Sequence, residues 1–153
     1  MLQIEALVVG SQAWAWMGIL LARVTVGGAF LLSGGGKLFV NARRQQMSQT
    51  LRDAHIPFPD FNAVFVSAVE FVFGLLLIAG AATPPACIML GCVMIIAILT
   101  IAARKIEASS PLGWLSEFLY LPEVLYLIIL TWLLLSGPGW FSVDHLILSK
   151  YHP

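Results

Sequence analysis

Long hydrophobic runs alternate with short polar segments along this chain. An α-helix rises about 1.5 Å per residue, so about 20 apolar residues are needed to cross the hydrocarbon core of a bilayer. Four runs reach roughly this length, and they cover residues 12–33, 61–81, 84–103 and 115–136. This pattern predicts an all-α integral membrane protein. We expect a four-helix bundle of antiparallel up-down-up-down order, with residues 1–153 in a single membrane domain.

The polar segments carry helix and turn signals of their own. Residues 41–55 are rich in Arg and Gln, with apolar positions every three or four residues, which predicts a short interfacial helix. A Gly-Pro-Gly turn at 137–139 ends the last run, and aromatic residues typical of a membrane interface follow it. Residues 140–149 are therefore predicted to form a second interfacial segment, with Ser142 as the cap of a short helix. Thr83 is expected to cap the third spanning helix.

The fourth run contains a proline in its interior. A helix that began after Pro122 would be too short to cross the bilayer. We therefore expect the helix to begin near Leu115 and to bend at Pro122. The bend would leave the carbonyl of Phe118 without its helical donor and would place Glu123 beside this defect.

The composition supports a membrane protein and excludes one class of partner. Hydrophobic residues make up 59% of the 153 residues and charged residues 10%, whereas soluble domains average about 45–50% and about 25%. The apolar surplus is expected to face lipid. Basic and acidic residues are equal in number, and no basic stripe follows a helix, so nucleic acid is excluded as a partner.

The distribution of Lys and Arg predicts the orientation in the membrane. Six of the eight basic residues lie in the first and third connections, whereas only Lys150 lies in the N-terminal, second or C-terminal segments. We therefore expect a multi-pass protein of the bacterial inner membrane with both termini in the periplasm. The first run lacks a preceding positive region and is expected to be retained as a span. The six basic residues on the cytoplasmic side are Lys37, Arg43, Arg44, Arg52, Arg104 and Lys105.

Three charged residues fall well inside the predicted spans, and a fourth, Glu117, lies at the edge of the last one. Arg23 and Glu70 lie near the middle of the first and second spans, at matching depth, and Glu123 comes close to the midplane in the fourth. An ionised side chain at the centre of a spanning helix costs about 2.5–3.5 kcal/mol. Arg can donate to two carboxylates, so we predict a buried Arg23–Glu70–Glu123 centre that binds a ligand or relays protons. Two alternatives stay open: the centre only fixes the helix register, or it faces a partner subunit.

Two further residues are candidates for this site. Ser67 lies one turn from Glu70 and would offer its hydroxyl to the cluster. Lys37 follows three glycines that are expected to unwind the end of the first helix, and snorkelling to the interface would explain its position without any chemistry. Gly27 and Gly74 each lie one turn from a charged residue and are expected to let their helices approach closely.

The cysteines, methionines and histidines predict no metal or haem site. Cys87 and Cys92 are the only cysteines, and they lie about 140° apart around a helix, so a disulfide between them and a dithiol mechanism are not expected. Together with Met89 and Met94 they would offer soft ligands to Cu(I), so all four are weak metal candidates, and ordinary packing is the favoured explanation. No histidine lies within a span, so we expect neither haem b nor a covalently bound cofactor.

Charged residues, glycines and apolar residues recur in a fixed order across the four spans and the closing segment. The residues concerned are Arg23, Gly27, Phe30, Gly34, Gly36, Lys37, Leu38, Glu70, Gly74, Leu75, Leu76, Leu77, Gly80, Glu123, Gly137, Pro138, Gly139, Phe141, Ser142, Val143 and Asp144. This order resembles the DoxX family of small four-helix bacterial membrane proteins, related to the small subunit of thiosulfate:quinone oxidoreductase. The chain departs from the family at Thr83-Pro84, where Thr-Arg is frequent, and at 100–107, which lack a His-containing stretch that many members have. Any site formed by that stretch would be altered here.

The resemblance implies membrane redox work, in a quinone-linked or oxidative-stress complex whose metal or flavin belongs to a partner subunit. The chain itself would be a non-catalytic subunit of an oxidoreductase, and the residues alone do not decide whether it is an enzyme. Quinone is the implied ligand, the bilayer and protein subunits are the implied partners, and a homo-oligomer is compatible with the sequence. Two alternatives remain. One is a transporter or binding protein for a small molecule or lipid, with a polar path through Lys37 or Glu117, and the other is a scaffold that anchors partners through the basic first connection.

Overall fold

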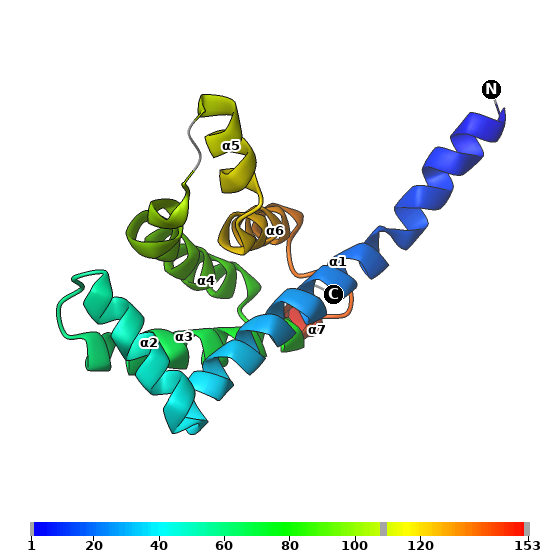
Figure 1. Ribbon diagram of the computed structural model, residues 1–153. Coiled ribbons are helices and arrows are strands. Elements are labelled where there is room, and N and C mark those ends of the chain that lie inside the picture. The colour runs from blue at the N-terminus through cyan, green and yellow to red at the C-terminus, as the bar shows by residue number, and fades with distance from the viewer. Residues whose placement is uncertain (1, 108–109, 152–153) are drawn as a thin grey trace.

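The computed structural model describes residues 2–107 and 110–151, and nearly all of them are helical (Figure 1). The predicted all-α class is therefore confirmed. In chain order the elements are α1 (Leu2–Phe39), α2 (Asn41–Asp53), α3 (Pro59–Ala79), α4 (Thr83–Ala97), a π-helical turn η1 (Ile98–Ala102), a 3₁₀ turn η2 (Ala103–Lys105), α5 (Pro111–Leu119), α6 (Pro122–Ser136) and α7 (Val143–Tyr151).

Within the described part of the chain, three helical stretches are long and apolar enough to cross a membrane. They are Trp16–Phe39, Pro59–Ala79 and Thr83–Ala102. Helices α5 and α6 together provide a fourth only if the pair forms one span, because their axes differ in direction by 60°. The described residues therefore contain three candidate spans, or four if the bent pair is counted as one.

The ends of two predicted spans are corrected by the structure. Helix α1 continues without a break through the three glycines to Phe39, so these glycines do not unwind it. In the fourth run, the predicted bend is a break between α5 and α6, where Leu121 takes an extended conformation. A residue that precedes proline avoids the helical region, which explains the break. The carbonyl of Phe118 is not left free, because it accepts a hydrogen bond from the backbone amide of Leu121.

Four helices surround the centre of the molecule, and each contacts two of the others. Helix α1 packs on α3 and α6, and α4 packs on the same two helices from the other side. Helix α2 lies against α3 and α1 (Figure 1). Fully buried leucines fill the space between α3, α4 and α6: Leu77, Leu90, Leu130 and Leu133.

The closest helix contact joins α1 and α3, and glycines make it possible. A Cβ at Gly27 would lie 2.8 Å from the backbone oxygen of Gly74, and a Cβ at Gly74 would lie 2.7 Å from the amide nitrogen of Leu31. Further along, a Cβ at Gly34 would lie 2.6 Å from backbone atoms of Ser67 and Phe71. The predicted close approach at Gly27 and Gly74 is present, and it fixes the antiparallel register of the two helices.

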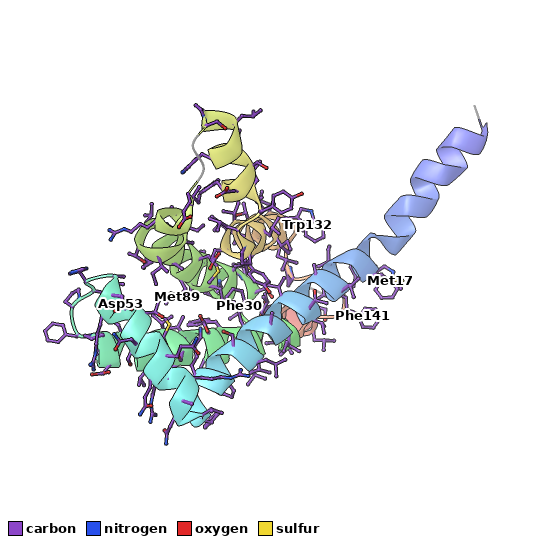
Figure 2. The ribbon with its side chains drawn as sticks, in the orientation of Figure 1. Met17, Phe30, Asp53, Met89, Trp132 and Phe141 are labelled. Atoms are coloured by element: carbon purple, nitrogen blue, oxygen red, sulfur yellow. The ribbon has the colours of Figure 1, made fainter. Side chains whose placement is uncertain are left out.

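The outward faces of these helices are apolar. In Figure 2, Met17 and Trp132 point away from the bundle, and both are more than a third exposed. Leu21, Leu75 and Leu125 are exposed on three different helices. Large apolar side chains are exposed on each of the four helices α1, α3, α4 and α6, and exposed apolar surface marks contact with lipid or with another protein. The surface is suited to contact with lipid chains.

Candidate functional site

The central feature of the candidate site is an ion pair between α1 and α3. Nζ of Lys37 lies 2.8 Å from Oε2 and 3.1 Å from Oε1 of Glu70. The Glu70 side chain is 5% exposed and that of Lys37 is 23% exposed. Snorkelling of Lys37 towards the interface is therefore not what the structure shows, since its ammonium turns back to the buried carboxylate.

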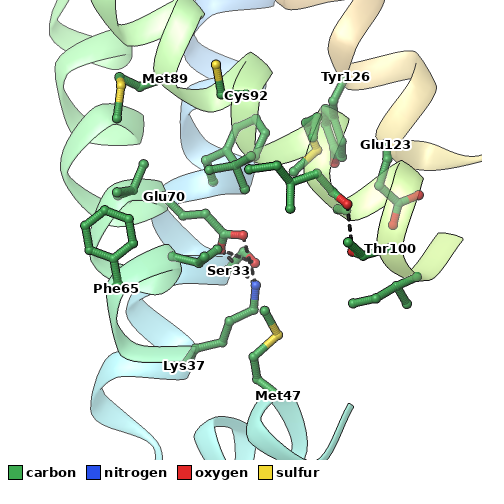
Figure 3. A pocket seen from close by; sticks show the side chains of 18 of the residues that line it. Ser33, Lys37, Met47, Phe65, Glu70, Met89, Cys92, Thr100, Glu123 and Tyr126 are labelled. Carbon is green, nitrogen blue, oxygen red and sulfur yellow. Dashed lines mark hydrogen bonds and ion pairs between the residues drawn. The ribbon is translucent and has the colours of Figure 1, made fainter. Parts of the chain in front are cut away.

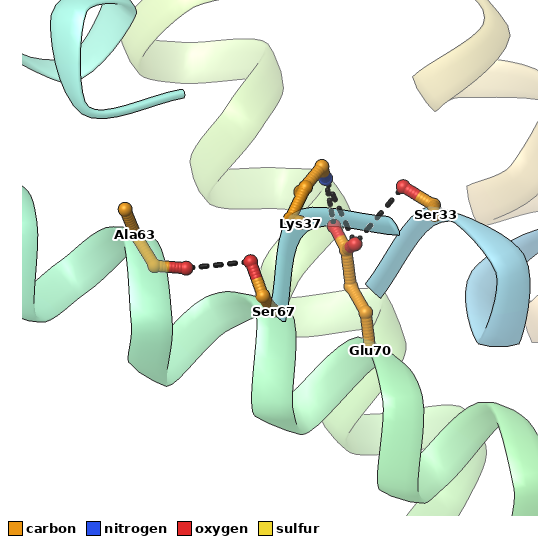
Figure 4. Close-up of polar contacts among 5 residues, drawn as sticks. All are labelled: Ser33, Lys37, Ala63, Ser67 and Glu70. Carbon is orange, nitrogen blue, oxygen red and sulfur yellow. Dashed lines mark hydrogen bonds and ion pairs between the residues drawn. The ribbon is translucent and has the colours of Figure 1, made fainter. Parts of the chain in front are cut away.

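A hydroxyl from α1 completes the surroundings of this carboxylate. The Ser33 hydroxyl donates to Oε2 of Glu70 at 3.1 Å, as Figure 4 shows. Ser67, which we expected in this role, donates instead to the carbonyl of Ala63 at 2.6 Å, within its own helix. Sequence reasoning missed Ser33. The signal was its spacing of four residues from Lys37, which puts both side chains on one face of α1.

The predicted Arg23–Glu70–Glu123 centre is wrong in its pairing. The Arg23 side chain, only 2% exposed, donates to the carbonyls of Pro138 and Phe141. The reason is the register set by the glycine contacts, which brings Arg23 beside Gly80 at the end of α3 and brings Glu70 beside Ser33. The sequence analysis placed Arg23 and Glu70 at equal depth because each lies near the middle of its hydrophobic run. Helix α1, however, extends beyond the predicted run 12–33 at both ends.

Arg23 therefore belongs to a second polar cluster, at the opposite end of the helices. The segment before α7 lies over the turn between α3 and α4, and Asp144 accepts hydrogen bonds from the amides of Ala82 at 2.7 Å and Thr83 at 2.8 Å. Asp144 thus satisfies the first amides of α4, a role expected of Thr83 itself. Ser142 caps α7 as predicted, because its hydroxyl accepts from the amide of His145 at 3.0 Å.

This arrangement influences the acidity of Asp144. Burial acts to raise its pKa, but the hydrogen bonds from the amides of Thr83 and Ala82 and the charge of Arg23 outweigh burial and lower the pKa below the ordinary value. The carboxylate form is favoured in the folded protein. The cluster around Arg23 holds the closing segment in place, and Arg23 does not line the cavity beside Glu70, so we assign the cluster a structural role.

A cavity of about 440 Å³ lies beside the Lys37–Glu70 pair, between α1, α3, α4 and α6 (Figure 3). Most of its walls are apolar. Met47 and Leu51 of α2 line it as well, so the helix predicted at 41–55 adds to the site. The polar side chains on its walls are Ser33, Lys37, Glu70, Thr100, Glu123 and Tyr126.

The wall across from the ion pair contains two irregular features. The π-helical turn η1 brings Thr100 and Ile101 to the cavity. Such turns widen a helix locally and are frequent at functional sites. Glu123 lies in the first turn of α6, and its Oε2 is buried without a hydrogen-bond partner among the described residues. Glu123 and Glu70 thus line one cavity, as the sequence suggested, but without the arginine.

Two openings connect the cavity with its surroundings. Phe65 on α3 and Ile96 on α4 line the cavity and are also exposed on the outer apolar face. The cavity therefore reaches the surface between these two helices. A smaller pocket of about 260 Å³ lies under α2, where Arg43, Gln46 and Thr50 line it. Both spaces include Ser33, Lys37 and Met47 in their walls, so they meet at the lysine.

The sulfur-containing residues of α4 are divided between the cavity and the core. Met89, Cys92 and Met94 line the cavity, and Cys92 is also exposed on the surface. Cys87 is buried in the apolar core, to which Met94 belongs as well. Both cysteines are free. Among the described residues, no three His, Cys, Asp or Glu side chains are grouped so that they could hold a metal ion.

The comparison with protein families supports the resemblance over the first three predicted spans. The family model for DoxX matches residues 18–103, which is more than half of the chain. The match includes α2, α3 and α4 and most of α1, and with them Lys37, Glu70 and the glycine contacts. No curated protein and no solved structure gives a significant match. Together with the three to four apolar helices, the family match indicates a membrane protein, and the chain belongs to the DoxX family.

Proposed function

We propose that this protein lies in the bacterial inner membrane as an antiparallel four-helix bundle and binds the ring of a quinone in the cavity beside Lys37 and Glu70. In this proposal it serves as a subunit of a membrane redox complex, and a partner subunit carries the redox centre. The observation that carries the proposal is the cavity itself, an apolar space of about 440 Å³ with a buried ion pair on one wall.

The character of the cavity favours a lipophilic ligand with a polar head. Ligand sites are mostly apolar, with a few polar groups that orient the ligand. Here an apolar body would contact Phe65, Met89 and Ile96 and would reach the site directly from the lipid phase, between α3 and α4. Nζ of Lys37 has three hydrogen-bond donors, and the two oxygens of Glu70 do not need all of them. The remaining donor is available to a ligand oxygen.

The binding proposal is tested by thermal melting of the purified full-length protein with short-chain benzoquinones and naphthoquinones. We expect the melting temperature to rise with ligand concentration, as mass action requires of a ligand that binds only the folded state. Ala97→Phe, which fills the cavity, should abolish the rise, whereas Ala42→Phe on the exposed side of α2 should leave it unchanged. No shift of the wild-type protein with any of these quinones would overturn the proposal.

The proposed redox complex requires a separate experiment. Gentle solubilisation of native membranes, followed by affinity purification of this chain and mass spectrometry, should recover an oxidoreductase subunit that carries a flavin or metal. A chain that purifies alone from membranes of respiring cells would contradict the assignment as a subunit. It would leave the ligand site untouched, because that site is formed by this chain.

The proposed orientation follows from the basic residues around α2 and η2, which would lie in the cytoplasm. The closing segment and the turn between α3 and α4 contact each other through Asp144, so both would lie on the periplasmic side. Alkaline phosphatase fused after the last residue should be active, and the same enzyme inserted between Asp53 and Pro59 should be inactive. The reverse result would contradict the orientation.

Transport is a second candidate, and one observation favours it. The pocket under α2 and the apolar cavity share Ser33, Lys37 and Met47 in their walls, so a path between them would pass Lys37. Reconstituted vesicles that take up a labelled amphiphile without any electron donor would support transport. Binding without uptake would support the quinone site alone.

A further inference from the structure

A small polar pocket lies between α1 and α2, next to the larger cavity. Its volume is about 260 Å³, and its walls are formed by Ser33, Lys37, Arg43, Gln46, Met47 and Thr50. We infer that this pocket binds a phosphodiester group, held by Arg43 and Lys37, and that the group belongs to the headgroup of an anionic phospholipid. The inference goes beyond the proposed function, because it concerns a second ligand and other residues.

The first step of the argument is how the chain brings two cations to one pocket. Helix α2 follows α1 after a single extended residue, Val40, and packs back against α1. Gly36 of α1 has no side chain, and Arg43 occupies the space that one would fill: a Cβ at Gly36 would lie 2.7 Å from Nη1 of Arg43. Lys37 is the next residue of α1 and lines the same pocket. Two cationic side chains from two helices therefore share one small space.

The second step is the charge balance of this pocket. A guanidinium is ionised at every pH at which proteins fold. The described residues form two ion pairs, Lys37–Glu70 and Arg52–Asp60, and neither includes Arg43. Glu70 compensates the charge of Lys37 and lines the larger cavity, and none of the walls of the small pocket is acidic. The positive charge of Arg43 is therefore left for an anion to balance.

The third step concerns the hydrogen bonds that the pocket offers. Arg43 is exposed, and its guanidinium can donate two parallel hydrogen bonds to two oxygens of a phosphate group. Nζ of Lys37 has a third donor besides the two that Glu70 accepts. The hydroxyls of Ser33 and Thr50 already donate within the protein. The pocket thus presents charged donors that a ligand can reach, which is the chemistry that recognises a phosphate oxygen.

The depth of the pocket and its charge favour a lipid as the source of the phosphate. In the proposed orientation, the end of α1 and the start of α2 lie at the cytoplasmic face of the bilayer, at the level of the lipid headgroups. Basic pockets between helices on this side bind anionic headgroups. The phosphodiester of phosphatidylglycerol carries one negative charge, which matches the single charge of Arg43, whereas a phosphate monoester carries about 1.5–2 at neutral pH.

The experiment titrates the full-length protein in a neutral detergent with dioctanoylphosphatidylglycerol and follows the melting temperature of each variant relative to its own lipid-free value. The reference lipid is dioctanoylglycerol, which lacks the phosphate and should bind at least about fivefold more weakly. An ion pair at a partly exposed site contributes up to about 1 kcal/mol, so Arg43→Gln should weaken the binding of phosphatidylglycerol about fivefold. The matched control is Arg44→Gln, which removes the same charge from the neighbouring residue, outside both pockets, and should leave the affinity unchanged.

Three results would overturn the inference. Equal losses in Arg43→Gln and Arg44→Gln would show that the lipid responds to the overall charge of α2 and not to this pocket. Equal affinity for phosphatidylglycerol and dioctanoylglycerol would exclude the phosphodiester as the recognised group. Glycerophosphoglycerol is the same headgroup without acyl chains, and binding as tight as that of the lipid would exclude the lipid as the source. Quinone binding is measured separately with Ala97→Phe, so failure of this inference is distinguishable from failure of the proposed function.

Discussion

Gly27 of α1 lies directly against Gly74 of α3, so that the two backbones touch without intervening side chains. This contact sets the register between the helices, and the register decides the partner of each charged residue. Four residues before Gly74, the Glu70 carboxylate reaches Ser33 and Lys37. Arg23, four residues before Gly27, lies beside the end of α3 and meets the closing segment instead. The ion pair of the site thus depends on the glycine contacts between the two helices.

The first prediction tests the register. Gly34→Ala places a methyl group 2.6 Å from backbone atoms of Ser67 and Phe71. Backbone atoms within a helix cannot move aside as the end of a flexible side chain can. We expect a loss of about 1–3 kcal/mol in the free energy of unfolding, the range found for overpacked sites. The measurement is denaturant or thermal unfolding in detergent.

The control for this prediction is Gly28→Ala. A methyl group added at this position has no neighbouring atom within 4 Å, apart from the nearby backbone of its own helix. Alanine stabilises a helix interior by about 0.5–1 kcal/mol relative to glycine, so this variant should melt higher than the wild type. If Gly34→Ala were as stable as Gly28→Ala, the close contact of α1 and α3 would be contradicted.

The second prediction concerns the asymmetry of the Lys37–Glu70 pair. Lys37→Met strands the nearly buried carboxylate of Glu70, whereas Glu70→Leu leaves a lysine that reaches the polar pocket under α2. Breaking a buried pair costs about 3–5 kcal/mol. We expect about 2–3 kcal/mol for Lys37→Met, because Lys37 is partly exposed, and about 1 kcal/mol for Glu70→Leu.

A double-mutant cycle with both changes measures the coupling between the two side chains. The double variant should be more stable than Lys37→Met alone, since it removes the stranded charge. Arg52→Met, which breaks the exposed pair with Asp60, is the matched control and should cost less than about 1 kcal/mol. Additive effects of the two changes would show that the pair is not coupled.

The third prediction concerns Arg23. Arg23→Ala removes the hydrogen bonds to the carbonyls of Pro138 and Phe141, so the closing segment should exchange its amide hydrogens faster. Hydrogen exchange with mass spectrometry over residues 137–144 measures this directly. Affinity for a quinone should change little, because Arg23 does not line the cavity. Loss of quinone binding without faster amide exchange would indicate that Arg23 belongs to the ligand site.

The fourth prediction concerns acid pH. The pKa of Asp144 is lowered in the folded protein, so the unfolded state binds a proton more readily, and the stabilisation by this carboxylate is present above the ordinary aspartate pKa of about 3.9. It is lost as the pH falls through the lowered folded pKa. Asp144→Asn should be less stable by about 1 kcal/mol at neutral pH, the value typical of a helix cap. Melting temperatures of the two proteins should converge below about pH 4. Parallel curves over this range would contradict the role of the carboxylate.

The sequence was sufficient for the helical class and the approximate helix positions, because long apolar runs can bury their backbone polar groups only as helices in lipid. It also identified Glu70, Glu123 and Lys37 as unusual. It could not assign the partner of Glu70, since the register between the two helices decides which cation of α1, Arg23 or Lys37, lies opposite this carboxylate. The register depends on which glycines of α1 face α3, and α1 contains seven, at residues 10, 18, 27, 28, 34, 35 and 36.

Three other features required coordinates for a physical reason. The π-helical turn η1 has no signal in an uninterrupted apolar run. The hydrogen bonds of Asp144 to α4 join segments 61 and 62 residues apart in the chain, so neither helix pattern could indicate them. The cavity exists because side chains from four helices fail to fill their common space, which depends on packing and not on any one segment.

Protection of Cys92 tests the ligand site most directly. Cys92 lines the cavity, and Cys87→Ser removes the other cysteine, so a thiol reagent reports on this position alone. In membranes, a bound quinone or quinol should slow the modification of Cys92 in proportion to its occupancy. A single cysteine at position 135, introduced by Leu135→Cys on the exposed face of α6, should react at an unchanged rate. Equal rates at Cys92 with and without a ligand that demonstrably binds would show that the ligand lies elsewhere.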